Sequence, residues 1–134
     1  KVLPEAFTCF TLSLDNLSEL TKRFGYTVGD GVLKDFAGLV QLMGDTEGMR
    51  GYNGVGRFVV FFEECSSKKA AAMIRILDNQ VEEYNSLNPE YPIRYTAAWA
   101  TTEETDTYEI RELLRLSQKK WKQMEKAKEQ SSCN

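Results

Sequence analysis

The segment 54–58, with the sequence GVGRF, combines residue types and spacing that could perform chemistry. Gly54 and Gly56 stand one residue apart, and an apolar run, 59–62, follows them. This composition predicts the tip of a β-hairpin. Because glycine permits backbone angles that side chains forbid, such a tip can bring backbone amides close to a phosphate. That use normally needs carboxylates and a metal nearby, whereas the tip here carries Arg57.

The composition excludes several kinds of active site. The chain contains no histidine, so His-dependent triads, His-type zinc sites and His general bases are absent. Cys9, Cys65 and Cys133 are odd in number and widely spaced, which does not predict a disulfide framework. Cys9 lies in an apolar run and is expected in the core. A net charge of −3 argues against nucleic acid, although the average can hide a local basic patch.

The length of 134 residues, 42% of them hydrophobic and 28% charged, predicts one globular domain. No apolar run approaches the roughly 20 residues that a membrane span needs. Since the chain begins at Lys1, we expect a piece of a longer protein: a cytoplasmic domain over 1–130, then a tail or linker remnant over 131–134. The parent protein could be anchored in a membrane.

The hydrophobic periodicity predicts elements in the order βααββαβα. Strands are expected at 6–14, 49–53, 58–63 and 93–101. Helices are expected at 17–24, 27–44, 66–86 and from 105 onward. Omitting one of the first two helices and the last helix leaves βαββαβ, the ferredoxin-like order, in which helices cover one face of an antiparallel sheet. The predicted class is therefore α+β, a ferredoxin-like fold with an antiparallel central sheet and helices packed around it.

Local signals predict how the helices begin and which residues face inward. Asp15-Asn16 can cap the first helix, Thr27 with Asp30 resembles a capping box, and Ser66 can cap the third helix. The charged run 119–129 is expected to be a solvated helix face. The inward residues expected on the last two helices are Met73, Ile76, Leu77, Val81, Tyr84, Ile110, Leu113, Leu114, Trp121 and Met124.

Two segments resemble the signature segments of GGDEF domains, the diguanylate cyclase family. The segment 52–62, YNGVGRFVVFF, places Gly54 on the first signature glycine and Phe58 on the signature phenylalanine. The segment 114–128 looks like the closing helix of the family. The segment 12–33, LSLDNLSELTKRFGYTVGDGVL, matches the family pattern at Gly25, Gly29, Asp30, Val32 and Leu33. The resemblance covers nearly the whole chain and implies a nucleotidyl cyclase-like fold.

The resemblance also implies where the family's chemistry would lie. GGDEF cyclases condense two GTP molecules into cyclic di-GMP across a pair of domains, with divalent metal neutralising the phosphates. The two metal carboxylates fall on Ser13 and Gly56, which offer a neutral hydroxyl and no side chain. The fourth signature residue, normally acidic, is Arg57, and the second signature glycine is Val55.

Other positions of the family site differ as well. Ser18 stands where the resemblance implies a phosphate-contacting lysine, and Thr21 where it implies an asparagine that reads guanine, whereas the partner aspartate survives as Asp30. The product-inhibition motif falls on Asp45 and Gly48 and is absent. The vestigial nucleotide-site positions are Ser13, Asn16, Leu17, Ser18, Thr21, Asp30, Gly54, Val55, Gly56 and Arg57.

These replacements predict a degenerate GGDEF domain that is not an enzyme and holds no metal or cofactor. Phosphoryl transfer depends on positioning and charge stabilisation, so loss of both metal carboxylates should lower the rate by some hundreds-fold or more. We expect a regulatory module of a larger bacterial signalling protein that binds neighbouring domains, forms a homodimer or binds another signalling domain, without nucleic acid or membrane contact. Alternatives are a receptor for GTP, ATP or a cyclic dinucleotide, and a residual cyclase with Asp15 and Asp30 as replacement ligands.

Several candidate residues have a structural interpretation beside the functional one. Asp30 is a helix cap or a guanine reader, and Asp15 is a cap or a stray metal ligand. Arg57 is a solvated hairpin residue, or it supplies the charge that a metal would bring to a phosphate. Trp99 and Trp121 are expected in the core or an interface rather than stacked on a base.

Overall fold

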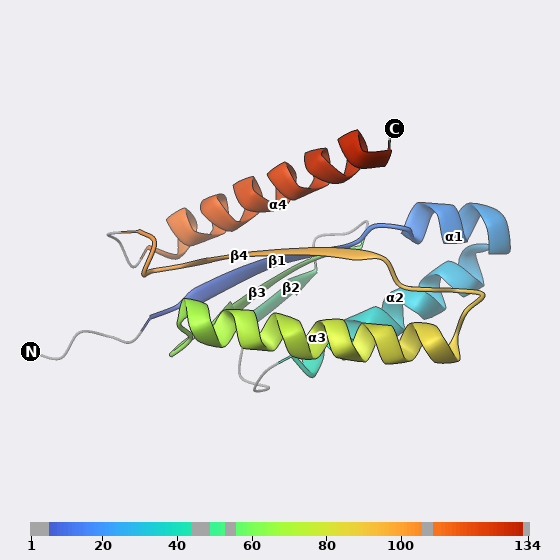
Figure 1. Cartoon of the computed structure of the whole chain (residues 1–134), viewed down its shortest axis with the longest axis horizontal. Coiled ribbons are helices and arrows are strands. Elements are labelled where there is room, and N and C mark those ends of the chain that lie inside the picture. The colour runs from blue at the N-terminus through green and yellow to red at the C-terminus, as the bar shows by residue number, and fades with distance from the viewer. Residues whose placement is uncertain (1–5, 44–48, 53–55, 106–108, 133–134) are drawn as a thin grey trace, which may run out of the picture.

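The computed structural model describes residues 6–43, 49–52, 56–105 and 109–132 (Figure 1). Within this part of the chain the element order is βααββαβα, as predicted. The strands are β1 (Thr8–Leu14), β2 (Met49–Tyr52), β3 (Arg57–Phe62) and β4 (Tyr95–Thr101). The helices are α1 (Leu17–Phe24), α2 (Tyr26–Gln41), α3 (Ser67–Leu87) and α4 (Ile110–Ser132).

The described strands form one antiparallel sheet in the order β2-β3-β1-β4. Strand β1 is central, and its residue Phe10 lies opposite Val60 of β3 and Trp99 of β4. All residues of β1 are buried, because both of its faces are covered. The α+β class and the ferredoxin-like strand order are therefore confirmed.

Helices cover both faces of this sheet (Figure 1). Helices α2 and α3 lie against the face that carries Phe10, Leu12 and Leu14. Helix α4 runs along the opposite face, where Leu113 packs with Cys9. The ferredoxin-like order alone places helices on one face of the sheet, so it does not account for α4 on the other face. This helix covers the outer face of β1 and β4 and brings its own side chains to the end of β1.

The larger core lies between the sheet and α2 with α3. Phe36 is fully buried there, with its ring centroid 5.7 Å from that of Phe58 and 5.5 Å from that of Tyr95. Phe10 packs edge-on against Phe62 at 5.6 Å. Aromatic pairs of this kind add to the free energy gained by burial alone.

Three residues that were predicted to face inward are exposed. Ile76, Ile110 and Met124 are exposed to 46%, 51% and 41%. The predictions for them were wrong because the buried stripe of each helix is narrower than the apolar pattern. On α3 it follows Met73, Leu77 and Val81 at a spacing of four, and Ile76 lies beside this line. The other inward residues predicted on these helices are buried or half-buried.

Only one of the predicted caps forms. The Ser66 side chain accepts a hydrogen bond from the Lys69 backbone amide at 3.2 Å and caps α3. The capping box of Thr27 and Asp30 was wrong, because α2 begins already at Tyr26. Gly25 precedes it with φ of 95°, which lets α2 follow α1 without a loop.

Helix α4 ends later than expected. It runs through Ser132, so Ser131 and Ser132 of the predicted tail are helical. Helix α2 ends at Gln41, and the predicted stop at Gly44 lies outside the described residues. Cys9 and Cys65 are free and buried, and burial raises the pKa of Cys9 to about 11. Cys133 lies outside the described residues. No helix in the described ranges is both long and apolar enough to cross a bilayer.

Candidate functional site

The candidate site lies where β1 ends beside the start of β3. Ser13 and Arg57 are register partners, and the Leu14 amide donates to the Gly56 carbonyl at 2.8 Å. The strand pairing thus brings together Ser13, Gly56 and Arg57, which are far apart in the sequence. Gly54 and Val55, the other predicted hairpin positions, lie outside the described residues.

The Ser13 hydroxyl is buried and has two partners. It accepts a hydrogen bond from Trp121 Nε1 at 2.8 Å and donates one to Asp15 Oδ1 at 2.7 Å. The indole comes from α4, which crosses the sheet above Ser13. The expectation that Trp121 belongs to the core or an interface is confirmed, and its N–H bonds directly to the predicted site.

Asp15 joins three elements instead of capping α1. Its carboxylate accepts from the Thr96 hydroxyl on β4 and from Lys128 Nζ on α4 at 3.3 Å. Lys128 Nζ also donates to the Tyr95 carbonyl at 2.9 Å. The interpretation of Asp15 as a cap was wrong, because these partners bind the side chain away from the amides of α1.

The adjacent Asn16 occupies the cap position without capping. Its side chain donates to the Pro92 carbonyl at 2.7 Å and accepts from the Arg94 amide at 3.1 Å. Asn16 therefore fixes the chain that leads into β4. It ties the start of α1 to the residues just before β4, the strand that carries Thr96.

Glu125 of α4 completes this network. Burial opposes ionisation of Asp15, but hydrogen bonds from Glu125, Thr96 and Ser13 and the charge of Lys128 together lower the pKa of Asp15. Burial raises the pKa of Glu125, and the hydrogen bond and charge of Asp15 raise it further. The two pKa shifts are opposite in direction, and they favour an ionised Asp15 beside a protonated Glu125.

We expect the change Glu125→Gln to stabilise the domain at neutral pH. The raised pKa of Glu125 means that its stabilising effect is complete below the unfolded value near 4.5 and is lost as pH rises through the folded value. A neutral amide avoids this loss, so the free energy of unfolding at pH 7 should rise by up to about 1 kcal/mol, a small value because solvent screens a half-buried group. Urea denaturation at pH 4 and pH 7 measures the difference.

The matched control is Glu129→Gln, which makes the same change at an exposed position of α4. It should leave the free energy of unfolding unchanged at both pH values. The lowered pKa of Asp15 acts in the opposite direction, because its stabilisation is lost as pH falls. A lower stability of Glu125→Gln at pH 7 would contradict the raised pKa of Glu125.

The predicted base-reading residues lie on α1 and α2. The Thr21 hydroxyl donates to the Leu17 carbonyl at 2.9 Å. A Cβ added at Gly29 would lie 2.3 Å from the Thr21 hydroxyl oxygen. Gly29 thus permits the close contact of the two helices. Asp30 forms an ion pair with Lys34 at 3.0 Å. Its interpretation as a cap was wrong, because α2 begins at Tyr26 and Asp30 lies inside the helix. Ser18 is exposed.

Gly56 is fixed by its backbone and its neighbours. Its φ is 75°, and an added Cβ would lie 3.3 Å from Leu17 Cδ2 and 3.4 Å from Leu14 Cβ. L-residues rarely adopt this conformation, so any side chain here is strained. The turn interpretation of Gly56 agrees with this geometry.

Arg57 is exposed, as expected for a hairpin residue, but it is held in place. Its guanidinium carbon lies 4.2 Å from the centroid of the Trp121 ring. The sequence reasoning missed Trp121, Glu125 and Lys128 as neighbours of the site. The only signal for them was a tryptophan within a charged helix, and periodicity does not reveal where such a helix packs.

The comparisons with known proteins agree with this architecture. The family model described as "Diguanylate cyclase, GGDEF domain" matches residues 3–132. None of the curated protein sequences matches this chain.

Several solved structures share the fold. The active GGEEF domain of a diguanylate cyclase from Vibrio cholerae has a TM-score of 0.80 and 19% identity, over 92% of this chain and 78% of that one. A microbial GGDEF domain solved for its interaction with cyclic di-GMP has a TM-score of 0.74 and 22% identity, over 92% of this chain and 74% of that one. The FimX GGDEF domain from Pseudomonas aeruginosa has a TM-score of 0.69 and 17% identity, over 87% of this chain and 72% of that one.

At these identities the structural matches show the fold alone, whereas the family model covers almost all residues. In the structure, the two signature-like segments are joined by strand pairing, with Ser13 of β1 opposite Arg57 of β3. The chain belongs to the GGDEF domain family of diguanylate cyclases.

Proposed function

We propose that this domain is a catalytically inactive, degenerate GGDEF domain with a regulatory role. The observation that carries the proposal is the state of Ser13. Its hydroxyl stands where the family resemblance implies a metal carboxylate, and it is already engaged by Trp121 Nε1 and the Asp15 carboxylate. A neutral, buried oxygen that already takes part in two hydrogen bonds is a poor ligand for magnesium, which prefers free anionic oxygens.

The second implied metal position supports the same proposal. Gly56 has no side chain, and its positive φ and its contacts with Leu17 and Leu14 disfavour one. In the described ranges, no three Cys, Asp or Glu side chains lie close enough to hold a metal ion. The residues present therefore do not fit the metal that the family chemistry requires.

Replacement ligands do not change this picture. Asp15 is paired with Lys128 of α4, and Asp30 is paired with Lys34 within α2. Among the described residues, no hydrogen bond or ion pair connects Asp30 or Thr21 with Ser13 or Arg57. These pairs argue against a residual cyclase.

The preserved fold supports a regulatory role. Helix packing at Gly29 and strand pairing at β1 are intact, while the groups for phosphoryl transfer are replaced. We propose a cytoplasmic module of a larger bacterial signalling protein that acts through neighbouring domains or a second copy. Binding of a nucleotide without turnover is the alternative, because the Arg57 guanidinium remains exposed.

The test is a turnover assay with GTP and magnesium or manganese, in which cyclic di-GMP is measured by mass spectrometry. An active GGDEF cyclase serves as the positive control. Because the metal position is lost, we expect a rate lower than that of the control by at least several hundred-fold. A rate within tenfold of the control would refute the proposal. Calorimetric titration with GTP, ATP and cyclic di-GMP tests the receptor alternative separately.

A further inference from the structure

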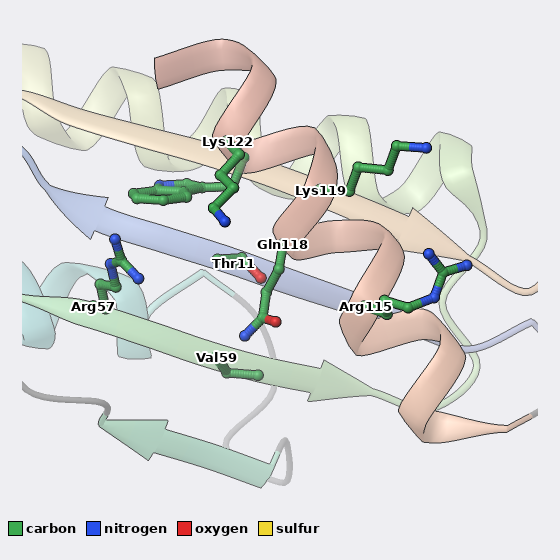
Figure 2. Close-up of a pocket in the computed structure, with 8 residues that line it drawn as sticks. Thr11, Arg57, Val59, Arg115, Gln118, Lys119 and Lys122 are labelled. Carbon is green, nitrogen blue, oxygen red and sulfur yellow. The ribbon is translucent and has the colours of Figure 1, made fainter. Parts of the chain in front are cut away.

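A groove separates α4 from the outer face of the sheet, beside β1 and β3. Its volume is about 420 Å³, within the range of small-molecule pockets. The basic residues that line it are Arg57, Arg115, Lys119 and Lys122 (Figure 2). None of the described residues that line it carries a carboxylate. A strong positive charge is thus concentrated in one place on a chain with a net charge of −3.

Three of these cations lie on one face of α4. Arg115, Lys119 and Lys122 follow one another at spacings of four and three, so they are neighbours on the helix surface. Like charges at this spacing repel one another. Arg115 has a partner in Glu112 at 3.0 Å, but both side chains are exposed and such a pair contributes little. Among the described residues, no carboxylate pairs with Lys119 or Lys122.

Arg57 faces this helix from β3. Its guanidinium carbon lies 4.2 Å from the centroid of the Trp121 ring, and this cation–π contact restrains the side chain before any ligand binds. Figure 2 shows Arg57 and Lys122 on opposite sides of one end of the groove, with the Gln118 side chain directed between the sheet and the helix. A planar guanidinium opposite an ammonium group suits a tetrahedral anion, which accepts two hydrogen bonds from the first and one from the second.

We propose that this groove is a binding site for a compact multivalent phosphate, such as a diphosphate group. The short groove limits the ligand to a few anionic groups. The acidic net charge of the chain disfavours an extended polyanion such as nucleic acid, which needs a continuous basic surface. The bound anion neutralises the mutual repulsion of the α4 cations and is held at the end that Arg57 and Lys122 define.

This inference goes beyond the proposed loss of catalysis. Lys119, Lys122 and Arg115 are not among the vestigial nucleotide-site positions, and only Arg57 is common to both. Binding in the groove therefore does not require that the domain be inactive, and a failed turnover assay does not decide it. The two proposals can fail independently.

The probe is sodium pyrophosphate, titrated into the full chain in a calorimeter without metal at low salt. We expect one site, with affinity reduced about tenfold or more by either Arg57→Gln or Lys122→Gln, because each removes charge-assisted hydrogen bonds. The change Arg57→Lys should give a partial loss, since it keeps the charge and removes the planar donor pair. Salt at about 0.5 M should weaken binding through screening.

The matched control is Lys126→Gln, which removes one charge from an exposed position of α4 outside the groove. It should change the affinity by less than about twofold, since a solvated charge at this distance is screened. Thermal melts should be unaltered for the Lys122 and Lys126 variants, because both side chains are exposed.

Three results would overturn the proposal. The first is no heat with millimolar pyrophosphate, and the second is equal weakening by Lys126→Gln and Lys122→Gln. The third is weakening by Thr21→Ala or Asp30→Asn, which would place the anion at the nucleotide-site positions. Titration with orthophosphate and with GTP distinguishes the source of the phosphate group. If GTP binds more tightly than pyrophosphate, and if Lys122→Gln weakens both equally, the ligand of the groove is a nucleotide.

Discussion

Replacement of Trp121 by alanine is expected to lower the free energy of unfolding by about 3–5 kcal/mol, the range for a large buried aromatic. The indole is buried between α4 and the sheet, donates to Ser13 Oγ at 2.8 Å and supports the Arg57 guanidinium. Its removal leaves a cavity and deprives the buried hydroxyl of its donor. Equilibrium urea denaturation measures the loss.

Two further variants separate packing from hydrogen bonding at this position. Trp121→Phe keeps an aromatic ring and removes the N–H, so it should cost less than Trp121→Ala, with about 1 kcal/mol due to the lost hydrogen bond. Met124→Ala, at an exposed position three residues later, should cost less than about 1 kcal/mol. Equal effects of Trp121→Ala and Met124→Ala would show that Trp121 does not join α4 to the sheet.

Replacement of Phe36 by alanine is expected to destabilise the domain by a similar amount, about 3–5 kcal/mol. Phe36 is fully buried on α2, and its ring packs against Phe58 of β3 and Tyr95 of β4. Few atoms can move into the space of a ring that is enclosed between α2 and the side chains of two strands, so the cavity remains largely open.

The control for Phe36 is Leu42→Ala, at the C-terminal end of the same helix. Leu42 is exposed to 63%, so this change should alter the free energy of unfolding by less than about 0.5 kcal/mol. Thermal and urea denaturation give both values. A Phe36→Ala variant that unfolds at the same urea concentration as Leu42→Ala would contradict the arrangement of the core.

The elements of the fold were predictable because they depend on local patterns. The alternation of Phe10, Leu12 and Leu14 with polar or small residues matches a strand whose two faces meet different layers. The stripe Met73, Leu77 and Val81 likewise matches one face of α3. In each case tertiary packing buries the residues that the periodicity selects.

The helix caps were less predictable because a cap depends on competing partners. Asp15 and Asn16 have the residue types of caps, but the chain that enters β4 offers them hydrogen bonds. Those partners are distant in sequence, and no local rule includes them. The positive φ of Gly25 similarly moved the start of α2 ahead of Thr27.

The composition of the candidate site was predicted only in part. Ser13, Gly56 and Arg57 meet because two neighbouring strands pair in register, which the family resemblance implied. Trp121, Glu125 and Lys128 reach the same place from α4, whose position depends on packing over the whole outer face of β1 and β4. The packing face of a charged helix cannot be assigned from charge pattern alone.

The central position of β1 has a consequence for how the chain reaches its native state. Thr8 pairs with Thr101, so the middle of the sheet joins residues from opposite ends of the domain. Closing so large a loop carries an entropic cost that is recovered only after the distant strand has docked. During translation, β1 therefore cannot pair with β4 until β4 has left the ribosome. Until then the unpaired edge of β1 and its apolar side chains are exposed to chaperones and to other nascent chains.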